Sequence, residues 1–138
     1  MKKQLFILTI ISLIIMSCNN KKETISNPYL GTWSRSFDLL DSKAEVVYTF
    51  YNDKVQYEMQ GGMSLKYIIK KDTFLINENK WIGNKDGETY VIFFKDKTDK
   101  EFTLLKLKTK DLTSALKMPF PADTAKSNFS SWNTFIKK

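Results

Sequence analysis

Beyond Pro28 the hydrophobic and polar positions alternate with a period of two, in short runs separated by turn residues. This period places every second side chain on one face of a β-strand, so each run predicts a strand with one buried face. The runs lie at 30–37, 44–51, 55–60, 65–69, 73–77, 81–82, 89–95 and 101–108. They predict an all-β fold, an antiparallel up-and-down meander barrel of about seven or eight strands, with no helix connecting parallel strands.

Four local features refine this expectation. Gly61-Gly62 predicts a hairpin, since both residues tolerate positive φ. Lys71-Asp72 predicts another turn, ahead of the run at 73–77. The run at 89–95 is apolar on both faces, which predicts a strand covered on both sides. In the second run Ala44, Val46, Tyr48 and Phe50 share one face, and we expect that face to be inside.

The tail has a different pattern. Met118-Pro119-Phe120-Pro121 ends any regular element, because proline lacks an amide hydrogen. After it, Asp123 is a candidate N-cap. Ala125, Phe129, Trp132 and Ile136 follow at helical spacing. The tail therefore predicts a short C-terminal helix docked on the barrel, with membrane contact through the same stripe as the alternative.

The N-terminal segment predicts export. Lys2 and Lys3 precede an apolar run at 5–15, which is shorter than the roughly 20 residues that span a bilayer. Ile15-Met16-Ser17-Cys18 resembles the lipobox of bacterial lipoproteins. That resemblance implies cleavage before Cys18, lipidation of its thiol with diacylglycerol and palmitate, and attachment to the membrane through the lipid anchor. The alternative is an ordinary signal peptide with an incidental thiol.

This interpretation divides the chain into a signal peptide at 1–17, a flexible tether at 18–27 and one domain at 28–138. Loss of Lys2 and Lys3 lowers the formal net charge by two, from +7 to +5. Arg35 is the only arginine, and the lysines are scattered among acidic residues, so we expect no nucleic-acid partner. The lipoprotein resemblance also implies location in the cell envelope, and Asn19 after the lipidated cysteine favours the outer membrane.

Leu30-Gly31-Thr32-Trp33 opens the first strand and resembles the Gly-x-Trp signature of lipocalins and of bacterial lipocalin-like lipoproteins. The resemblance implies that Gly31 permits close backbone approach and that Trp33 plugs the closed end of the barrel. It also implies a small ligand that enters at the other end. The family's arginine that stacks on this tryptophan is absent, and Lys106 or Lys108 would stand in its place.

Catalytic chemistry is poorly represented, so we expect a protein that is not an enzyme and that has no metal or cofactor. The chain has no histidine, and lipidation would consume its single cysteine. No serine lies in a Gly-x-Ser-x-Gly context. The paired carboxylates, such as Asp96 and Asp99, lie in turns.

The aromatic face predicts the binding site. Tyrosine hydroxyls and one arginine are suited to an apolar or amphipathic ligand. The candidate ligand-binding residues are Arg35, Tyr48, Phe50, Tyr57 and Tyr67. An eight-stranded barrel can also be filled by side chains. The chain would then be a protein-binding module of the envelope, an inhibitor or assembly subunit, with Val47, Ile68 and Leu75 as candidates for an outer patch. Carbohydrate binding through an exposed Trp81 is a third hypothesis.

Overall fold

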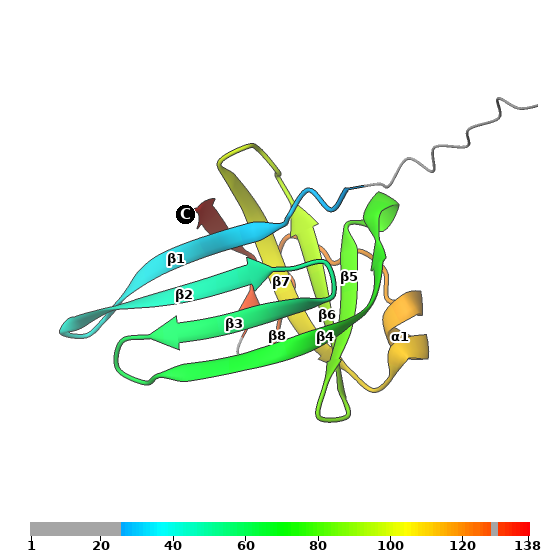
Figure 1. The fold of residues 1–138 in the computed structure, drawn as a ribbon, viewed down its shortest axis with the longest axis horizontal. Coiled ribbons are helices and arrows are strands. Elements are labelled where there is room, and N and C mark those ends of the chain that lie inside the picture. The colour runs from blue at the N-terminus through cyan, green and yellow to red at the C-terminus, as the bar shows by residue number, and fades with distance from the viewer. Residues whose placement is uncertain (1–25, 128–129) are drawn as a thin grey trace, which may run out of the picture.

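The structure, a computed structural model, describes residues 26–127 and 130–138. The predicted signal peptide, Cys18 and most of the tether lie outside the described residues. Figure 1 shows the strands wrapped into one barrel with a single short α-helix against its outer wall. The strand pairings of the barrel that the structure describes join residues between Gly31 and Lys137.

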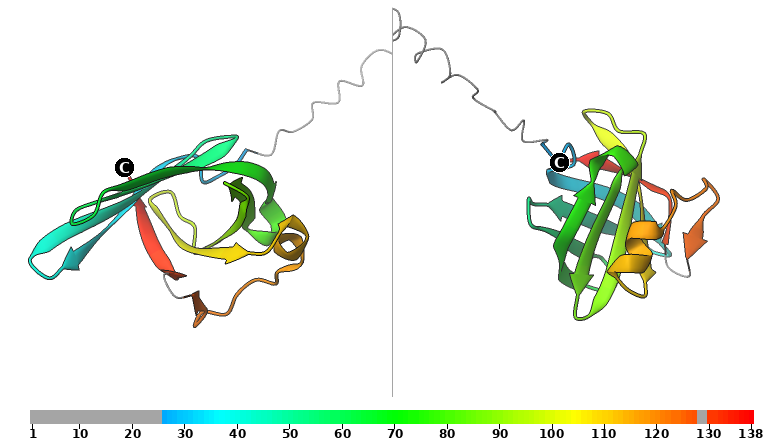
Figure 2. Two further views of the ribbon diagram at one scale, coloured as in Figure 1. Left: turned by 90° about the horizontal axis from the view of Figure 1, so that it is seen from below. Right: turned by 90° about the vertical axis from the view of Figure 1, so that its right-hand side faces the viewer.

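Eight antiparallel strands close the barrel, which confirms the predicted fold class. Seven of them follow one another along the chain as a meander, and the last strand closes the ring between the seventh and the first (Figure 2). The strands are β1 (Gly31–Leu39), β2 (Ser42–Phe50), β3 (Lys54–Gln60), β4 (Leu65–Leu75), β5 (Lys80–Lys85), β6 (Glu88–Lys95), β7 (Glu101–Thr109) and β10 (Asn133–Lys137). Closure joins β10 to β1 at Trp33 and Ser34 and to β7 along four residue pairs, which shortens the open sheet edges that usually promote aggregation.

The predicted C-terminal helix is wrong, because the last five-residue segment is the closing strand β10. Phe135 pairs with Phe102 of β7, and Lys137 pairs with Trp33 of β1. Without β10 the facing edges of β1 and β7 would expose unpaired amides and carbonyls, so pairing outweighs the helical spacing of the apolar residues. Upstream of β10, β8 (Lys126–Ser127) and β9 (Ser130–Ser131) form a small separate ladder.

The helix lies earlier, as α1 (Leu112–Lys117). Its N-cap is Asp111, whose side chain accepts a hydrogen bond from the Ser114 amide at 2.7 Å. Lys80 secures the other end: its Nζ donates to the carbonyls of Leu116 at 2.9 Å and Met118 at 2.8 Å. The right-hand view of Figure 2 shows α1 lying across the outside of the barrel wall, where it contacts β5, β6 and β7.

The predicted turn at Lys71-Asp72 is also wrong, because β4 runs through it without a break. The register between β4 and β5 shifts between Lys71 and Thr73, as in a β-bulge. Bulges increase local twist and help a sheet to curve into a barrel. β4 ends instead in the short 3-10 helix η2 (Ile76–Glu78), followed by Asn79 in the left-handed conformation at φ 47°.

The inward faces of the strands form the core. The predicted inner face of β2 is confirmed, since Ala44, Tyr48 and Phe50 are buried. The prediction for β6 is also confirmed: alternate residues point into the barrel, whereas Val91 and Phe93 pack outward beneath α1. The packing therefore consists of the barrel interior and a smaller outer cluster that includes Ala115 of α1.

Candidate functional site

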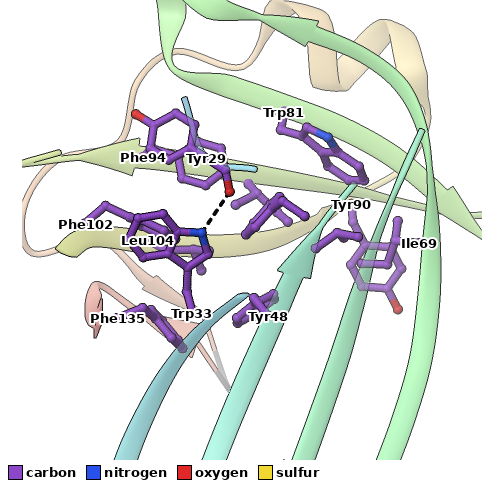
Figure 3. Packing of buried hydrophobic residues seen from close by; sticks show 13 residues of the cluster. Tyr29, Trp33, Tyr48, Ile69, Trp81, Tyr90, Phe94, Phe102, Leu104 and Phe135 are labelled. Carbon is purple, nitrogen blue, oxygen red and sulfur yellow. Dashed lines mark hydrogen bonds between the residues drawn. The ribbon is translucent and has the colours of Figure 1, made fainter. Parts of the chain in front are cut away.

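One end of the barrel is filled by aromatic side chains, with Trp33 among them. Gly31, at φ 112°, turns the chain into β1, a conformation that L-residues rarely adopt. Two residues later the Trp33 side chain is 1% exposed, and its Nε1 donates to the carbonyl of Tyr29 at 2.8 Å (Figure 3). Its ring meets Phe102 edge-on, with centroids 4.6 Å apart. These contacts seal the end of the barrel from which β1 starts.

Two lysines flank Trp33 where the lipocalin resemblance implies an arginine. The Nζ atoms of Lys97 and of Lys137 lie 5.1 Å and 5.8 Å from the ring centroid, within cation–π distance. Lys137 belongs to β10, the strand next to β1. Lys106, which the sequence suggested for this place, lies instead among the tyrosines farther along the barrel.

Farther along the strands the interior becomes more polar. On β1 the inward residues run from Trp33 to Arg35, and on β7 they run from Phe102 through Leu104 to Lys106. The side chains at the far end leave a cavity of about 230 Å³, which we call the tyrosine cavity. The barrel is thus packed at one end and hollow at the other. The cavity is lined by Arg35, Phe37, Val46, Tyr48, Tyr57, Met59, Leu104, Lys106, Ser130, Ser131, Asn133 and Phe135.

Three of the five predicted ligand-binding residues line this cavity: Arg35, Tyr48 and Tyr57. Tyr67 lies beside them, since its ring stacks on Tyr57 with a centroid separation of 4.8 Å. Phe50 lies deeper, in the filled half, where its ring meets Phe94 at 5.4 Å. The structure therefore brings four of the candidates together at the cavity. Phe50 does not line the cavity, although its ring stacks on Tyr48 with centroids 6.0 Å apart.

Lys106 is the central polar group of the site, and the sequence analysis did not select it for this role. Its Nζ lies 4.2 Å from the ring centroid of Tyr57 and 5.0 Å from that of Tyr67, and it hydrogen-bonds the Tyr67 hydroxyl. The rings of Tyr48 and Tyr90 lie within 6 Å, at 5.6 and 5.9 Å. We call these four rings the Lys106 cage. The alternation of Phe102, Leu104 and Lys106 on β7 was the signal that could have identified an inward lysine.

Burial controls the titration of this site. Desolvation, with repulsion from Lys108 as a smaller effect, lowers the pKa of Lys106 to about 8. Burial also raises the pKa of Tyr48 well above its usual value, and that of Tyr67 likewise. The tyrosines therefore remain neutral donors over the pH range in which Lys106 loses its proton.

The cavity presents positive charge. Arg35 and Lys106 line it, and no aspartate or glutamate is among its described lining residues. The carboxylate of Glu88, on β6, has other partners: it accepts from Lys108 at 2.6 Å and from the Tyr90 hydroxyl at 2.8 Å. The site is thus an apolar, aromatic pocket with two cationic groups and several hydroxyl donors. These few polar groups could fix the orientation of a bound molecule.

The structure also shows where the residues of the other binding hypotheses lie. Trp81 is 0% exposed, so the hypothesis of carbohydrate binding through an exposed Trp81 is wrong. Of the three residues suggested for an outer patch, Val47 is buried, Leu75 is half-buried and Ile68 is exposed. Within residues 26–127 and 130–138 there is no cluster of three metal-ligating side chains. No helix in that part of the chain is long and apolar enough to cross a membrane.

Comparison with protein-family models, with curated proteins and with solved structures gives no match for this chain. The likeness to lipocalins therefore consists of two features of the molecule itself. One is the closed eight-stranded antiparallel barrel, and the other is the Gly31–Trp33 segment at its sealed end.

Proposed function

We propose that this chain is a lipid-anchored lipoprotein of the bacterial envelope whose barrel binds one small apolar or amphipathic molecule. The observation that carries the binding proposal is the tyrosine cavity, which starts at Tyr48, the cross-strand partner of Trp33, and extends along the strands to Phe37. Aromatic and aliphatic walls favour an apolar body, while Lys106 and the tyrosine hydroxyls offer a few polar contacts, the usual composition of ligand pockets.

The size of the cavity limits the ligand. A cavity of about 150 Å³ in a protein core can hold a benzene molecule. The tyrosine cavity, at about 230 Å³, has room for a ring with a substituent or for a short alkyl chain. Larger ligands need a pocket of about 300 Å³ or more. A small amphipathic molecule therefore fits this interior best.

The anchor proposal rests on the sequence. Ile15-Met16-Ser17-Cys18 follows a short apolar run, and Cys18 is the only cysteine of the chain. Two or more acyl chains hold a protein durably at a bilayer. A tether at 18–27 would leave the barrel free in the aqueous phase beside the outer membrane. The ligand-binding end and the lipid anchor would then act independently.

The binding proposal is tested with 1-naphthylamine, a small neutral fluorescent apolar probe, and the chain lacking residues 1–18. We expect one probe molecule per barrel. Val46→Phe, which adds a ring inside the cavity, should abolish binding. Ile68→Phe, on the exposed outer wall, is the matched control and should bind as the wild type does. No binding by a protein with the circular dichroism of a folded β-barrel would contradict the proposal.

A protein-binding module is the second candidate function, and the hairpin tips favour it. Leu40, between β1 and β2, is 105% exposed, and Met63, between β3 and β4, is 68% exposed. The tips lie together, since a side chain at Gly62 would come within 3.3 Å of Leu39. Both hairpins extend away from the rest of the barrel in Figure 1. If the probe does not bind, and Leu40→Asp still folds, we would search for a protein partner that binds these hairpin tips.

A further inference from the structure

The ammonium group of Lys106 lies inside the barrel without a carboxylate partner among the residues that the structure describes. Its hydrogen-bond acceptor there is the hydroxyl of Tyr67, a neutral group. Five ion pairs join other lysines to acidic side chains in the described part of the chain, and none of them includes Lys106. A buried cation is costly unless an anion compensates it.

Every strand around Lys106 contributes a neutral or cationic group, apart from the one carboxylate on β6. That carboxylate, Glu88, is already bound by Lys108 and by the Tyr90 hydroxyl. Lys85 of β5 is paired with Asp86 and lies over the Tyr67 ring at 5.5 Å. The titratable and charged groups that face the site are Arg35 on β1, Tyr48 on β2, Tyr57 on β3, Tyr67 on β4, Lys85 on β5, Glu88 and Tyr90 on β6, and Lys108 on β7.

Arg35 and Lys106 are the two cationic residues among those that line the tyrosine cavity. They lie beside apolar side chains such as Met59 and Phe135. This combination suits a molecule with an apolar body and one negative charge. The guanidinium group offers paired donors that match a carboxylate, and the ammonium group is a compact point charge. Tyrosine hydroxyls can add hydrogen bonds to the same oxygens.

This inference rests on the function proposed above. We propose that the ligand is an amphipathic organic anion, of which a short-chain carboxylic acid is the simplest example, and that its charged group binds at Lys106. Arg35 is the second cation of the same cavity. The four rings of the Lys106 cage partly shield the pair from water, which strengthens the attraction between the opposite charges.

The proposal has a distinctive dependence on pH. The anion binds the protonated amine, and the pKa of Lys106 is about 8 in the free protein. Affinity should therefore be full below that pH and fall about tenfold per pH unit above it, until the pKa of the complex is reached. The tyrosines do not interfere, since burial raises the pKa of Tyr90 to about 12 and that of Tyr67 further. The pKa of Lys85 is raised by its bond to Asp86, so its charge persists over this range.

Isothermal titration calorimetry with the chain lacking residues 1–18 tests the charge preference. Octanoate, octanol and octylamine share one chain and differ in charge. We expect octanoate to bind about tenfold or more tightly than octanol, as for one charge-assisted hydrogen bond. Lys106→Met should remove this preference and leave octanol binding as it was. Lys70→Met, on the exposed outer face of β4, is the matched control: it removes the same charge at a residue that does not line the cavity and should change octanoate affinity by less than about threefold.

Lys106→Arg provides the second measurement. It keeps the charge at every accessible pH, so its octanoate affinity should be constant where the wild type weakens. If Lys106→Met does not fold, the comparison of Lys106→Arg with the wild type across pH still decides the question. Octanol binding as tightly as octanoate, or a wild-type affinity that is flat above pH 8, would overturn the charge assignment while the proposed binding function stands. If the folded barrel binds none of the three ligands, both the charge assignment and the proposed binding function would be overturned.

Discussion

The two buried tryptophans provide a direct test of how the closed end of the barrel is held together. Trp33 and Trp81 are both at most 1% exposed, and both belong to the interior cluster. They differ in one respect. The Trp33 Nε1 donates to the Tyr29 carbonyl at 2.8 Å, whereas the Trp81 Nε1 is buried without a hydrogen-bond partner among the described residues. Replacing each by phenylalanine therefore compares a satisfied indole with an unsatisfied one.

The two substitutions remove the same atoms, so the loss of packed volume is similar in the two variants. In Trp33→Phe the Tyr29 carbonyl is left buried without its donor, which costs about 1–3 kcal/mol. In Trp81→Phe no buried acceptor loses its donor, because the Trp81 Nε1 has no hydrogen-bond partner among the described residues. We therefore expect Trp33→Phe to lower the free energy of unfolding by about 2 kcal/mol more than Trp81→Phe does. Trp33→Ala, which removes the whole ring, should cost about 3–5 kcal/mol.

Urea unfolding of the chain lacking residues 1–18, followed by far-ultraviolet circular dichroism, measures these differences. With an m value of about 2 kcal/mol per molar urea, the two phenylalanine variants should unfold at midpoints about 1 M apart. The wild type and an outer-wall variant, Ile68→Ala, provide the references. Equal midpoints for Trp33→Phe and Trp81→Phe, with unchanged m values, would refute the reasoning. The bond to Tyr29 would then contribute nothing to the sealed end.

The remaining predictions concern other parts of the chain. Lys80→Met should cost about 2 kcal/mol and speed hydrogen exchange in α1, because the carbonyls of Leu116 and Met118 lose their donor; unchanged exchange would contradict this role. Gly61→Ala should destabilise more than Gly87→Ala in thermal unfolding, since both have positive φ but only the Gly61 Cβ would meet a backbone oxygen, at 2.5 Å. Cys18→Ala should release the protein from membrane fractions or leave it unprocessed. Retention in salt-washed membranes after normal cleavage would refute lipid anchoring.

Much of the barrel could be read from local pattern. Seven of its eight strands lie where the alternation predicts them, because an inward face and an outward face impose period two on any strand of a barrel. The hairpin at Gly61-Gly62 was also predictable, since both residues have positive φ there. The predicted number of strands agrees with the structure partly because two errors offset each other. The runs on either side of Lys71-Asp72 are one strand, β4, and β10 was taken for a helix.

The site was predicted less completely than the fold. Tyr48, Tyr57 and Tyr67 were chosen for their position on alternating faces, and the structure brings them together. Lys106 was not chosen, because a lysine in a sequence is usually at the surface. Whether a residue lies in a filled or a hollow part of the barrel depends on its height along the strands, and the alternation carries no information on height. Phe50 and Tyr48 share a face of β2 but lie at different heights along it. Of these two residues, Tyr48 alone lines the cavity.

The sequence by itself determined where seven of the eight barrel strands lie and which of their side chains point inward. Only the tertiary structure decided which strand edges meet, where the helix lies and which lysine enters the barrel. Local periodicity reflects the environment of one segment, whereas closure depends on backbone groups far apart in sequence. The edges of β1 and β7 both need hydrogen-bond partners, and β10 provides them at Trp33 and Ser34 of β1 and along 101–104 of β7. That requirement outweighs the helical spacing of the tail, because an unpaired edge leaves many polar groups unsatisfied at once.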